Sequence, residues 1–178
     1  PLVSRDLRVE IDERVAADGE ILKTAAEVDF SPIMEKFRES GVESIAIAFM
    51  NAYRNDANEA AALAKLQALA GDIPVCASTG VVPEKGEFER FSTCVLNAYL
   101  TPVIRTYLNT LAGELEGQGI SAPVNVMGSN GGVMTLDQAA QFAAGTFLSG
   151  PVGGAGGAVR ICEMAGVDDC ITFDMGGT

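Results

Sequence analysis

The chain contains no histidine and no tryptophan, and it carries only 12 lysines and arginines against 24 acidic residues. Without histidine, neither a Ser-His-Asp triad nor a histidine-ligated zinc site can form within these residues. The net charge of -12 argues against nucleic acid and anionic membrane surfaces as partners, because both attract basic faces. Carboxylates, hydroxyls and main-chain amides are the groups that remain for catalysis.

A long apolar run and a Cys-x-x-Cys pair are also missing. No stretch reaches the roughly 20 apolar residues of a membrane-spanning helix, and no basic-then-apolar leader opens the chain. Cys76, Cys94, Cys162 and Cys170 each lie in or beside an apolar stretch, where a reduced thiol behaves as a small hydrophobic group. The sequence therefore predicts a cytoplasmic protein with no membrane partner.

Short apolar runs of strand length alternate with helical patterns, which predicts an α/β fold with a mixed sheet and flanking helices. An alternating pattern from Leu7 to Val15, followed by the Asp18-Gly19 pair, predicts an opening hairpin that returns near Ile21. The further strands are expected at residues 44–50, 73–77, 124–127 and 170–173.

Helix signals separate these strands. Ser31 before Pro32 is typical of a helix start, and Asp56 followed three residues later by Glu59 resembles a capping box. Pro102 lies within the longest helical pattern and predicts two helices or one marked kink. The expected helices cover residues 31–41, 57–70, 84–116, 137–143 and 149–166.

Three glycine-rich segments follow apolar runs and share one design, because glycine lets main-chain amides approach an anion closely. For the first segment the alternative is a plain turn, and for the second it is close packing of a helix on a sheet. For the third it is an ordinary turn. The segments are Ser129-Asn130-Gly131-Gly132, Ser149-Gly150-Pro151-Val152-Gly153-Gly154 and Asp174-Met175-Gly176-Gly177-Thr178.

The third segment carries the most chemical information. Its expected strand ends in Asp174, whose carboxylate suits a magnesium ion or the water around it. Gly176 and Gly177 offer amides to a phosphate, and Thr178 adds a hydroxyl. Such a motif normally continues into a hairpin or helix, and the first residue is Pro1, so we expect the sequence to be a fragment of a longer protein.

Together these motifs resemble the hydantoinase/oxoprolinase family, which includes ATP-dependent hydantoinases, 5-oxoprolinases and acetone-type carboxylases. The resemblance covers nearly the whole chain, although Val152 stands where the family usually has alanine. The segments that carry it, in the family's order, are residues 9–15, 87–90, 97–100 with Pro102, 129–132, 149–151 and 170–178.

The resemblance implies an ATPase fold of the actin and hexokinase (RNase H-like) type, in which two aspartate-containing loops bind the phosphates of one nucleotide. This chain holds the second loop only. Residues 1–80 would be the end of the family's N-terminal region, and residues 81–178 the start of its central domain. The isolated fragment is therefore expected to bind ATP weakly and to be inactive.

The implied activity is ATP-dependent hydrolysis of a cyclic amide, of the hydantoin or 5-oxoproline type, through phosphoryl activation of the substrate. A related ketone carboxylase subunit, a sugar-kinase relative and a non-catalytic subunit-binding module are the alternatives. The implied cofactors are ATP and Mg²⁺, and the implied partners are a cyclic amide or ketone and a second large subunit of the hydantoinase B type.

The resemblance also assigns roles to residues. Asp174 would be the catalytic carboxylate on the magnesium side. Glu87, Glu89 and Arg90 form either a polar cluster near the site or a solvated helix face. The implied nucleotide-binding residues are Gly176, Gly177, Thr178, Ser149, Gly150, Gly153 and Gly154. The candidates for the substrate cleft are Ser129, Asn130, Gly131 and Gly132.

Overall fold

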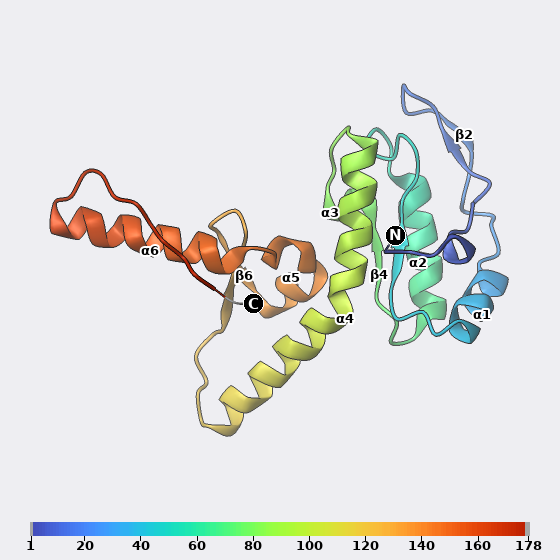
Figure 1. Cartoon of the computed structure of the whole chain (residues 1–178). Helices are drawn as coiled ribbons and strands as arrows, with labels where there is room; N and C mark the ends of the chain where they lie inside the picture. Colours follow the sequence, from blue (N-terminus) through green and yellow to red (C-terminus); the bar gives the residue numbers. More distant parts are fainter. Residues whose placement is uncertain (1, 177–178) are drawn as a thin grey trace. The chain divides into compact units, whose positions relative to one another are not determined.

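The computed structural model describes residues 2–176, and the chain divides into two compact units. The first unit extends to Arg105 and the second starts at Thr106, within the long helix α4 (Glu87–Gly117). Helices and short strands occur in both units (Figure 1), which confirms the predicted α/β class. The domain boundary expected between residues 80 and 81 stays a prediction. No helix in the described range is both long and apolar enough to cross a membrane.

The first unit opens with the expected hairpin. After the short 3-10 helix η1 (Arg5–Leu7), strand β1 (Arg14–Val15) pairs antiparallel with β2 (Ile21–Lys23). Gly19 adopts a φ of +98° in the turn, a conformation that favours glycine. The strands are shorter than the sequence pattern predicts, because residues 8–13 make no ladder with a neighbour.

A parallel strand pair forms the centre of the first unit. Strand β3 (Ile45–Ile47) pairs in parallel with β4 (Val75–Ala77), and helix α2 (Ala57–Ala70) provides the crossover between them. Parallel neighbours require such a long connection, and the helix covers one face of the pair. Three two-stranded sheets are present in the described residues in place of one larger mixed sheet.

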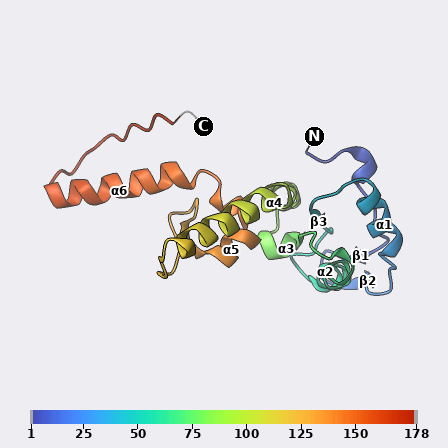
Figure 2. The ribbon, with the colours of Figure 1, turned by 90° about the horizontal axis from the view of Figure 1, so that it is seen from below.

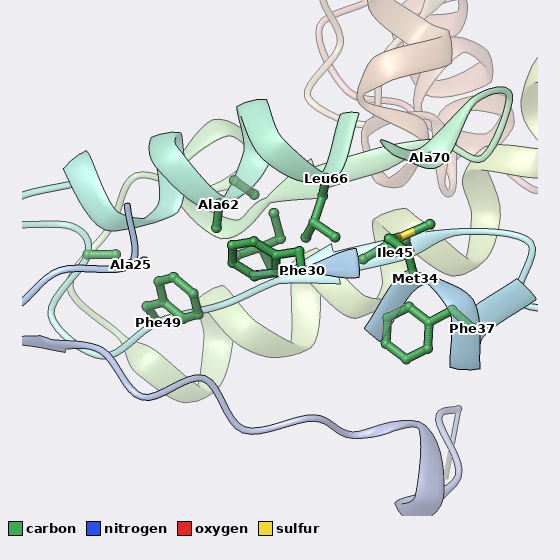
Figure 3. Close-up of a cluster of buried hydrophobic side chains, with 12 residues drawn as sticks. Ala25, Phe30, Met34, Phe37, Ile45, Phe49, Ala62, Leu66 and Ala70 are labelled. Atoms are coloured by element: carbon green, nitrogen blue, oxygen red, sulfur yellow. The ribbon is translucent and has the colours of Figure 1, made fainter. Parts of the chain in front are cut away.

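The hydrophobic core of the first unit lies between α2, the parallel strands and helix α1 (Ser31–Glu39). Figure 3 shows Ala62 and Leu66 on α2 directed toward Phe30, with Met34 and Ile45 close by. Met34 and Ala62 are completely buried. The cluster consists of Ala25, Phe30, Met34, Phe37, Ile45, Ile47, Phe49, Ala52, Ala62, Leu66, Ala70 and Ala77.

The start of α1 differs by one position from the sequence prediction. The N-cap is Phe30, and Ser31 is already helical. The Ser31 amide donates to Oδ1 of Asp29 at 2.9 Å, so an aspartate one residue before the N-cap satisfies this exposed donor. The helix ends as expected before Gly41, which has a φ of +66°.

The predicted capping box on α2 is wrong. Asp56 is the N-cap but makes no capping bond with its side chain, and the Ala57 amide donates to Oδ1 of Asn55 at 3.1 Å. Glu59 is completely buried. Its carboxylate accepts hydrogen bonds from Phe49, which follows β3, and from Ser78 and Thr79, which follow β4.

The second unit contains a hairpin followed by helices. Strands β5 (Asn125–Met127) and β6 (Val133–Thr135) pair antiparallel. Helix α5 (Leu136–Gln141) begins with a capping box between Thr135 and Gln138. The 3-10 helix η2 (Ala143–Thr146) and helix α6 (Ser149–Ala165) follow. α6 ends at Gly166 as expected, whereas α5 is shorter than the predicted helix.

The region from α3 to α4 differs from the sequence prediction in two ways. Helix α4 continues through Pro102, so the predicted division into two helices is wrong, and a kink there stays a prediction. The hydroxyl of Thr101 donates to the Asn97 carbonyl at 2.7 Å, a side-chain bond in the turn before the proline. A short helix that the sequence analysis did not anticipate, α3 (Ser78–Val81), lies between β4 and α4.

The strand expected at residues 170–173 is absent. This segment is extended but irregular, and no neighbouring strand pairs with it in the described part of the chain. Ile171 is 98% exposed and Phe173 84% exposed. A strand requires a hydrogen-bonded partner, so its apolar composition alone is insufficient here.

Candidate functional site

The first glycine-rich segment, residues 129–132, lies in the loop that joins β5 to β6. Both the amide and the hydroxyl of Ser129 donate to the Gly145 carbonyl, at 2.7 and 3.1 Å. The Gly132 amide donates to Oδ1 of Asn130 at 2.9 Å. These donors therefore hold the loop in shape and attach it to η2, and they are already used within the protein.

Gly131 gives this loop its turn. Its φ of +80° is one that residues with a side chain rarely adopt. The Gly128 amide donates to the Gly132 carbonyl at 2.8 Å and closes the hairpin. The segment is thus a well-formed turn, as the simpler interpretation of the sequence expected. Its role in a substrate cleft stays a prediction.

The second segment forms the start of α6, a helix of 17 residues. Its N-cap, Leu148, has a φ of +61° and provides no side-chain capping bond. The first amides of a helix have no partner within the helix, so those of Ser149 and Gly150 face outward from its N-terminal end. Pro151 follows in the first turn, where its missing amide costs nothing. This end of α6 is therefore suited to an anion.

Gly153 and Gly154 lie in the second turn of α6. Amides at this depth donate to carbonyls one turn earlier, so they are not available to a nucleotide. A Cβ atom added at Gly153 would lie 3.8 Å from Cγ of Met127 on β5, which indicates close packing at this point. Their contribution to a nucleotide site would be the absence of side chains, which leaves space for the nucleotide.

The hairpin loop and the start of α6 are neighbours. A Cβ atom added at Gly131 would lie 3.8 Å from Cγ1 of Val152, one added at Gly153 would lie 3.8 Å from Cγ of Met127, and α6 contacts β5. The second unit therefore brings two of the three predicted segments together, although they are about 20 residues apart in the sequence. Sequence spacing alone did not predict this contact.

Asp174 lies outside the regular elements. After Gly166 the chain turns back in the direction of the N-terminal end of α6, as both views in Figures 1 and 2 show. Asp174 and Gly176 are exposed, and Met175 is 82% exposed. Gly177 and Thr178 lie outside the described residues, so the third segment is only partly described.

Among residues 2–176, no group of three or more aspartate, glutamate or cysteine side chains could hold a metal ion. A closed cage of protein ligands is thus not available there. Magnesium commonly binds through one or two carboxylates together with substrate phosphates and water. The exposed carboxylate of Asp174 fits that mode of binding, and the free amides of Ser149 and Gly150 fit a phosphate.

A buried polar cluster in the first unit was missed by the sequence analysis. Glu59 and Arg90 are both completely buried, and the hydroxyl of Ser78 links them. This hydroxyl donates to Oε1 of Glu59 at 2.6 Å and accepts from Nε of Arg90 at 3.0 Å. The interpretation of Arg90 as part of a solvated helix face is therefore wrong.

The remaining polar atoms of this cluster are also paired. The carboxylate of Glu59 accepts from the Phe49 amide at 2.8 Å, and from the Thr79 amide and hydroxyl at 2.9 and 2.8 Å. Arg90 donates to the carbonyls of Phe49 and Glu84, at 2.7 and 3.2 Å. The cluster thus fastens α4 to the segments that follow β3 and β4. It is a structural support, because its polar atoms leave little for a ligand.

Comparisons with known proteins identify the family. A family model described as Hydantoinase/oxoprolinase matches residues 90–178, and one described as Hydantoinase/oxoprolinase N-terminal region matches residues 1–69. The caprolactamase subunit alpha of Pseudomonas jessenii is 34% identical over 99% of this chain. The 5-oxoprolinase of Saccharomyces cerevisiae is 32% identical over 89% of it. The chain spans only 25% and 12% of the length of these two relatives.

Two solved structures share the fold. The ATP-dependent caprolactamase from Pseudomonas jessenii matches with a TM-score of 0.76 and 31% identity, covering 93% of this chain and 24% of that one. Nucleotide-free acetone carboxylase, described for ATP-dependent acetone carboxylation, matches with a TM-score of 0.68 and 26% identity, covering 86% and 22%. These neighbours are consistent with an ATPase fold of the actin and hexokinase type. The chain belongs to the hydantoinase/oxoprolinase family.

Proposed function

We propose that the complete protein is a cytoplasmic, ATP-dependent hydrolase of cyclic amides of the hydantoin or 5-oxoproline type. The observation that carries this proposal is the contact in the second unit between the glycine hairpin and the uncapped start of α6. It creates an anion-accepting end of a helix beside a turn with little side-chain bulk. The relatives named as a caprolactamase and a 5-oxoprolinase support the choice of substrate class.

In this proposal the start of α6 binds phosphate. The amides of Ser149 and Gly150 and the positive end of the helix dipole stabilise negative charge, and the N-cap Leu148 provides no side-chain capping bond. Residues 129–132 would form a wall of the nucleotide or substrate cleft. The extension of the site to Gly176, Gly177 and Thr178 rests on the family motif.

Asp174 would hold the magnesium ion that accompanies ATP. Mg²⁺ supplies neutralisation of phosphate charge, and Asp174 needs only to offer a carboxylate oxygen, since phosphates and water complete the coordination. Phosphoryl transfer depends mainly on positioning and charge stabilisation. Amides, a carboxylate and hydroxyls are sufficient for this chemistry, which explains how a chain without histidine can take part in it.

The proposed reaction transfers the γ-phosphoryl group of ATP to the amide oxygen and leaves ADP. The substituted carbon is more electrophilic, so water attacks it, the C–N bond breaks and the nitrogen takes up a proton. A second water releases inorganic phosphate. The sum is one cyclic amide, one ATP and two waters converted to the open amino acid, ADP and phosphate.

The related ketone carboxylation is the second candidate, and the match to acetone carboxylase favours it. In that reaction ATP would activate a carbonyl oxygen, and a carbon nucleophile would be carboxylated. Either activity would employ a second large subunit, as the name of the caprolactamase subunit alpha suggests for that relative.

The test is the replacement Asp174→Ala in the complete protein together with its partner subunit. ADP release is measured with Mg²⁺ and ATP in the presence of hydantoin, 5-oxoproline, caprolactam, or acetone with bicarbonate. We expect ADP release that depends on a cyclic amide, and a loss on the order of 100-fold or more in the variant. Release that depends on acetone and bicarbonate would support the carboxylase instead.

Asp169→Ala is the matched control, because Asp169 is another exposed carboxylate of the same irregular segment. It is expected to retain wild-type ADP release. Undiminished activity of Asp174→Ala would refute the role of this aspartate. Isothermal titration of the 178-residue chain provides a further test: tight ATP binding by this chain alone would contradict the two-loop arrangement.

A further inference from the structure

Two cysteines in the first unit lie close together. Cys76 is in β4 and Cys94 is on α4, and their Sγ atoms are 3.7 Å apart. Cys94 is completely buried, and its thiol also lies 3.5 Å from the Ile47 carbonyl oxygen. Cys76 is partly exposed. A disulfide has an S–S distance of about 2.05 Å, so a shift of less than roughly 2 Å would bring the two sulfurs to bonding distance.

The environments of the two thiols differ. The hydrogen bond from Cys94 lowers the pKa of the Cys76 thiol below its ordinary value, in spite of partial burial. The same bond, together with desolvation, raises the pKa of Cys94. The thiolate is the reactive form of cysteine, so the more accessible of the two sulfurs is also the more nucleophilic.

We propose that Cys76 and Cys94 form a reversible oxidation site, in which Cys76 reacts first with a small peroxide and Cys94 then closes a disulfide. This inference does not depend on the proposed ATP-dependent activity. It assigns the pair a modification beyond the sequence prediction, which gave all four cysteines the role of small hydrophobic groups.

The oxidation takes place in two steps. The thiolate of Cys76 attacks one oxygen of hydrogen peroxide, the O–O bond breaks, and the leaving oxygen takes up protons to become water. Cys76 is then a sulfenic acid. Cys94 passes its proton to the oxygen of the sulfenic acid as its sulfur attacks the Cys76 sulfur, so the S–O bond breaks and the second water leaves. Two thiols lose two electrons, and one peroxide gains them.

The disulfide would join β4 to α4 beside the buried polar cluster. Cys76 is two residues before Ser78, and Cys94 is four residues after Arg90, which is about one helical turn. The new bond would therefore run next to the Ser78–Arg90 hydrogen bond, which connects α4 to α3, the short helix directly after β4. Oxidation is expected to make the separation of α4 from β4 slower.

The experiment treats the folded, full-length protein with hydrogen peroxide, then unfolds it, blocks free thiols and digests it with trypsin. Cleavage after Lys65, Lys85, Arg90 and Arg105 places Cys76 in the peptide of residues 66–85 and Cys94 in the peptide of residues 91–105. Mass spectrometry is expected to detect these two peptides joined, and a reductant is expected to separate them. Peroxide treatment that leaves both cysteines free for blocking would overturn the proposal.

The control concerns the other two cysteines. Cys162 and Cys170 both follow Arg160 without an intervening lysine or arginine, so a bond between them stays within one tryptic peptide and cannot imitate the expected product. The Cys162→Ser, Cys170→Ser double variant is expected to form the joined peptides to the same extent as the wild type. Loss of the joined product in this variant would contradict the direct reaction between Cys76 and Cys94.

The order of the two steps has its own test. In Cys94→Ala the sulfenic acid on Cys76 has no partner, and dimedone is expected to trap it there. In Cys76→Ser, Cys94 is expected to stay unreactive. Circular dichroism confirms that each variant is folded; Cys94→Ser replaces Cys94→Ala if the latter unfolds. Dimedone labelling of Cys94 in folded Cys76→Ser would overturn the assigned order.

Discussion

The two units differ in the extent to which their apolar side chains are buried. In the first unit, α1, α2 and the parallel strands enclose one hydrophobic cluster. In the second, the 17-residue helix α6 has no buried residue, although it carries Val159, Ile161 and Met164, of which Met164 is 75% exposed. Substitutions in the core of the first unit therefore act mainly on stability, whereas an exposed candidate residue of the second unit such as Asp174 can be changed with little cost to packing.

The polar groups show the same contrast. Glu59 and Arg90 are buried in the first unit with hydrogen-bond partners around them. No buried side-chain nitrogen or oxygen lacks a partner within the described range. The predicted functional groups of the second unit, such as Asp174, are exposed instead. Burial with full pairing marks structural polar residues here, and exposure marks the candidates for chemistry.

The largest stability effect is expected for Glu59→Ala. It removes the carboxylate that four donors share and leaves the charge of Arg90 without nearby compensation in the interior. Breaking such a buried arrangement costs about 3–5 kcal/mol, measured as the free energy of unfolding in urea.

Glu163→Ala is the matched control, because Glu163 is an exposed glutamate in α6 whose partner Arg160 lies 3.1 Å away. An exposed pair of this kind contributes about 0–1 kcal/mol. Equal losses of unfolding free energy in the two variants would contradict the distinction between buried polar groups in the first unit and exposed ones in the second.

The next largest difference in stability is expected between substitutions of two aliphatic side chains, one buried and one exposed. Leu66→Ala deletes a side chain that is 4% exposed within the cluster and is expected to cost about 2–5 kcal/mol. Ile161→Ala on α6, where the isoleucine is 68% exposed, is expected to change stability by less than about 0.5 kcal/mol in the 178-residue chain. Thermal and urea unfolding of both variants measure the difference.

The same two substitutions in the complete protein sharpen the comparison. If another part of that protein covers α6, Ile161→Ala becomes more costly there, while the cost of Leu66→Ala stays the same. A large loss for Ile161→Ala already in the 178-residue chain would contradict the open arrangement of the second unit.

The smallest effect concerns acid sensitivity at α1. The hydrogen bond from the Ser31 amide lowers the pKa of Asp29 in the folded state. The stabilising contribution is thus present above the unfolded pKa, about 3.9, and is lost as the pH falls through the lower folded value. Asp29→Asn keeps an acceptor oxygen but does not titrate. Between pH 7 and pH 2, this variant is expected to lose less stability than the wild type, and an equal loss would contradict the assignment.

Much of the fold follows from local sequence signals. The hairpin at Gly19, the parallel strands around Ile45 and Val75, and the end of α6 at Gly166 agree with apolar periodicity and glycine placement. Three of the failures share one cause. Glu59, Arg90 and residues 170–176 depend on partners that are distant in sequence, and a local pattern contains no information on whether such partners are present.

For the candidate site, the sequence predicted the residue types but not their arrangement. The contact of Gly131 with Val152 depends on how the β5–β6 hairpin meets α6. The sequence also did not separate Gly150, at the exposed helix start, from Gly153, whose amide lies one turn deeper. Only the amides of the first helical turn are free to bind a ligand. Which residues form that turn is known only when the first residue of the helix is known.

The complete burial of Arg90 also determines how the protein responds to proteases. Trypsin cuts after arginine and lysine, but it must draw several residues of extended chain into its cleft. Lys85 and Arg160 are exposed, so cutting there does not require Arg90 to leave the interior. Cleavage after Arg90 requires α4 to separate from Phe49 and Ser78, which accept its hydrogen bonds. The rate of that single cut therefore measures how often the first unit opens under native conditions, without any label or denaturant.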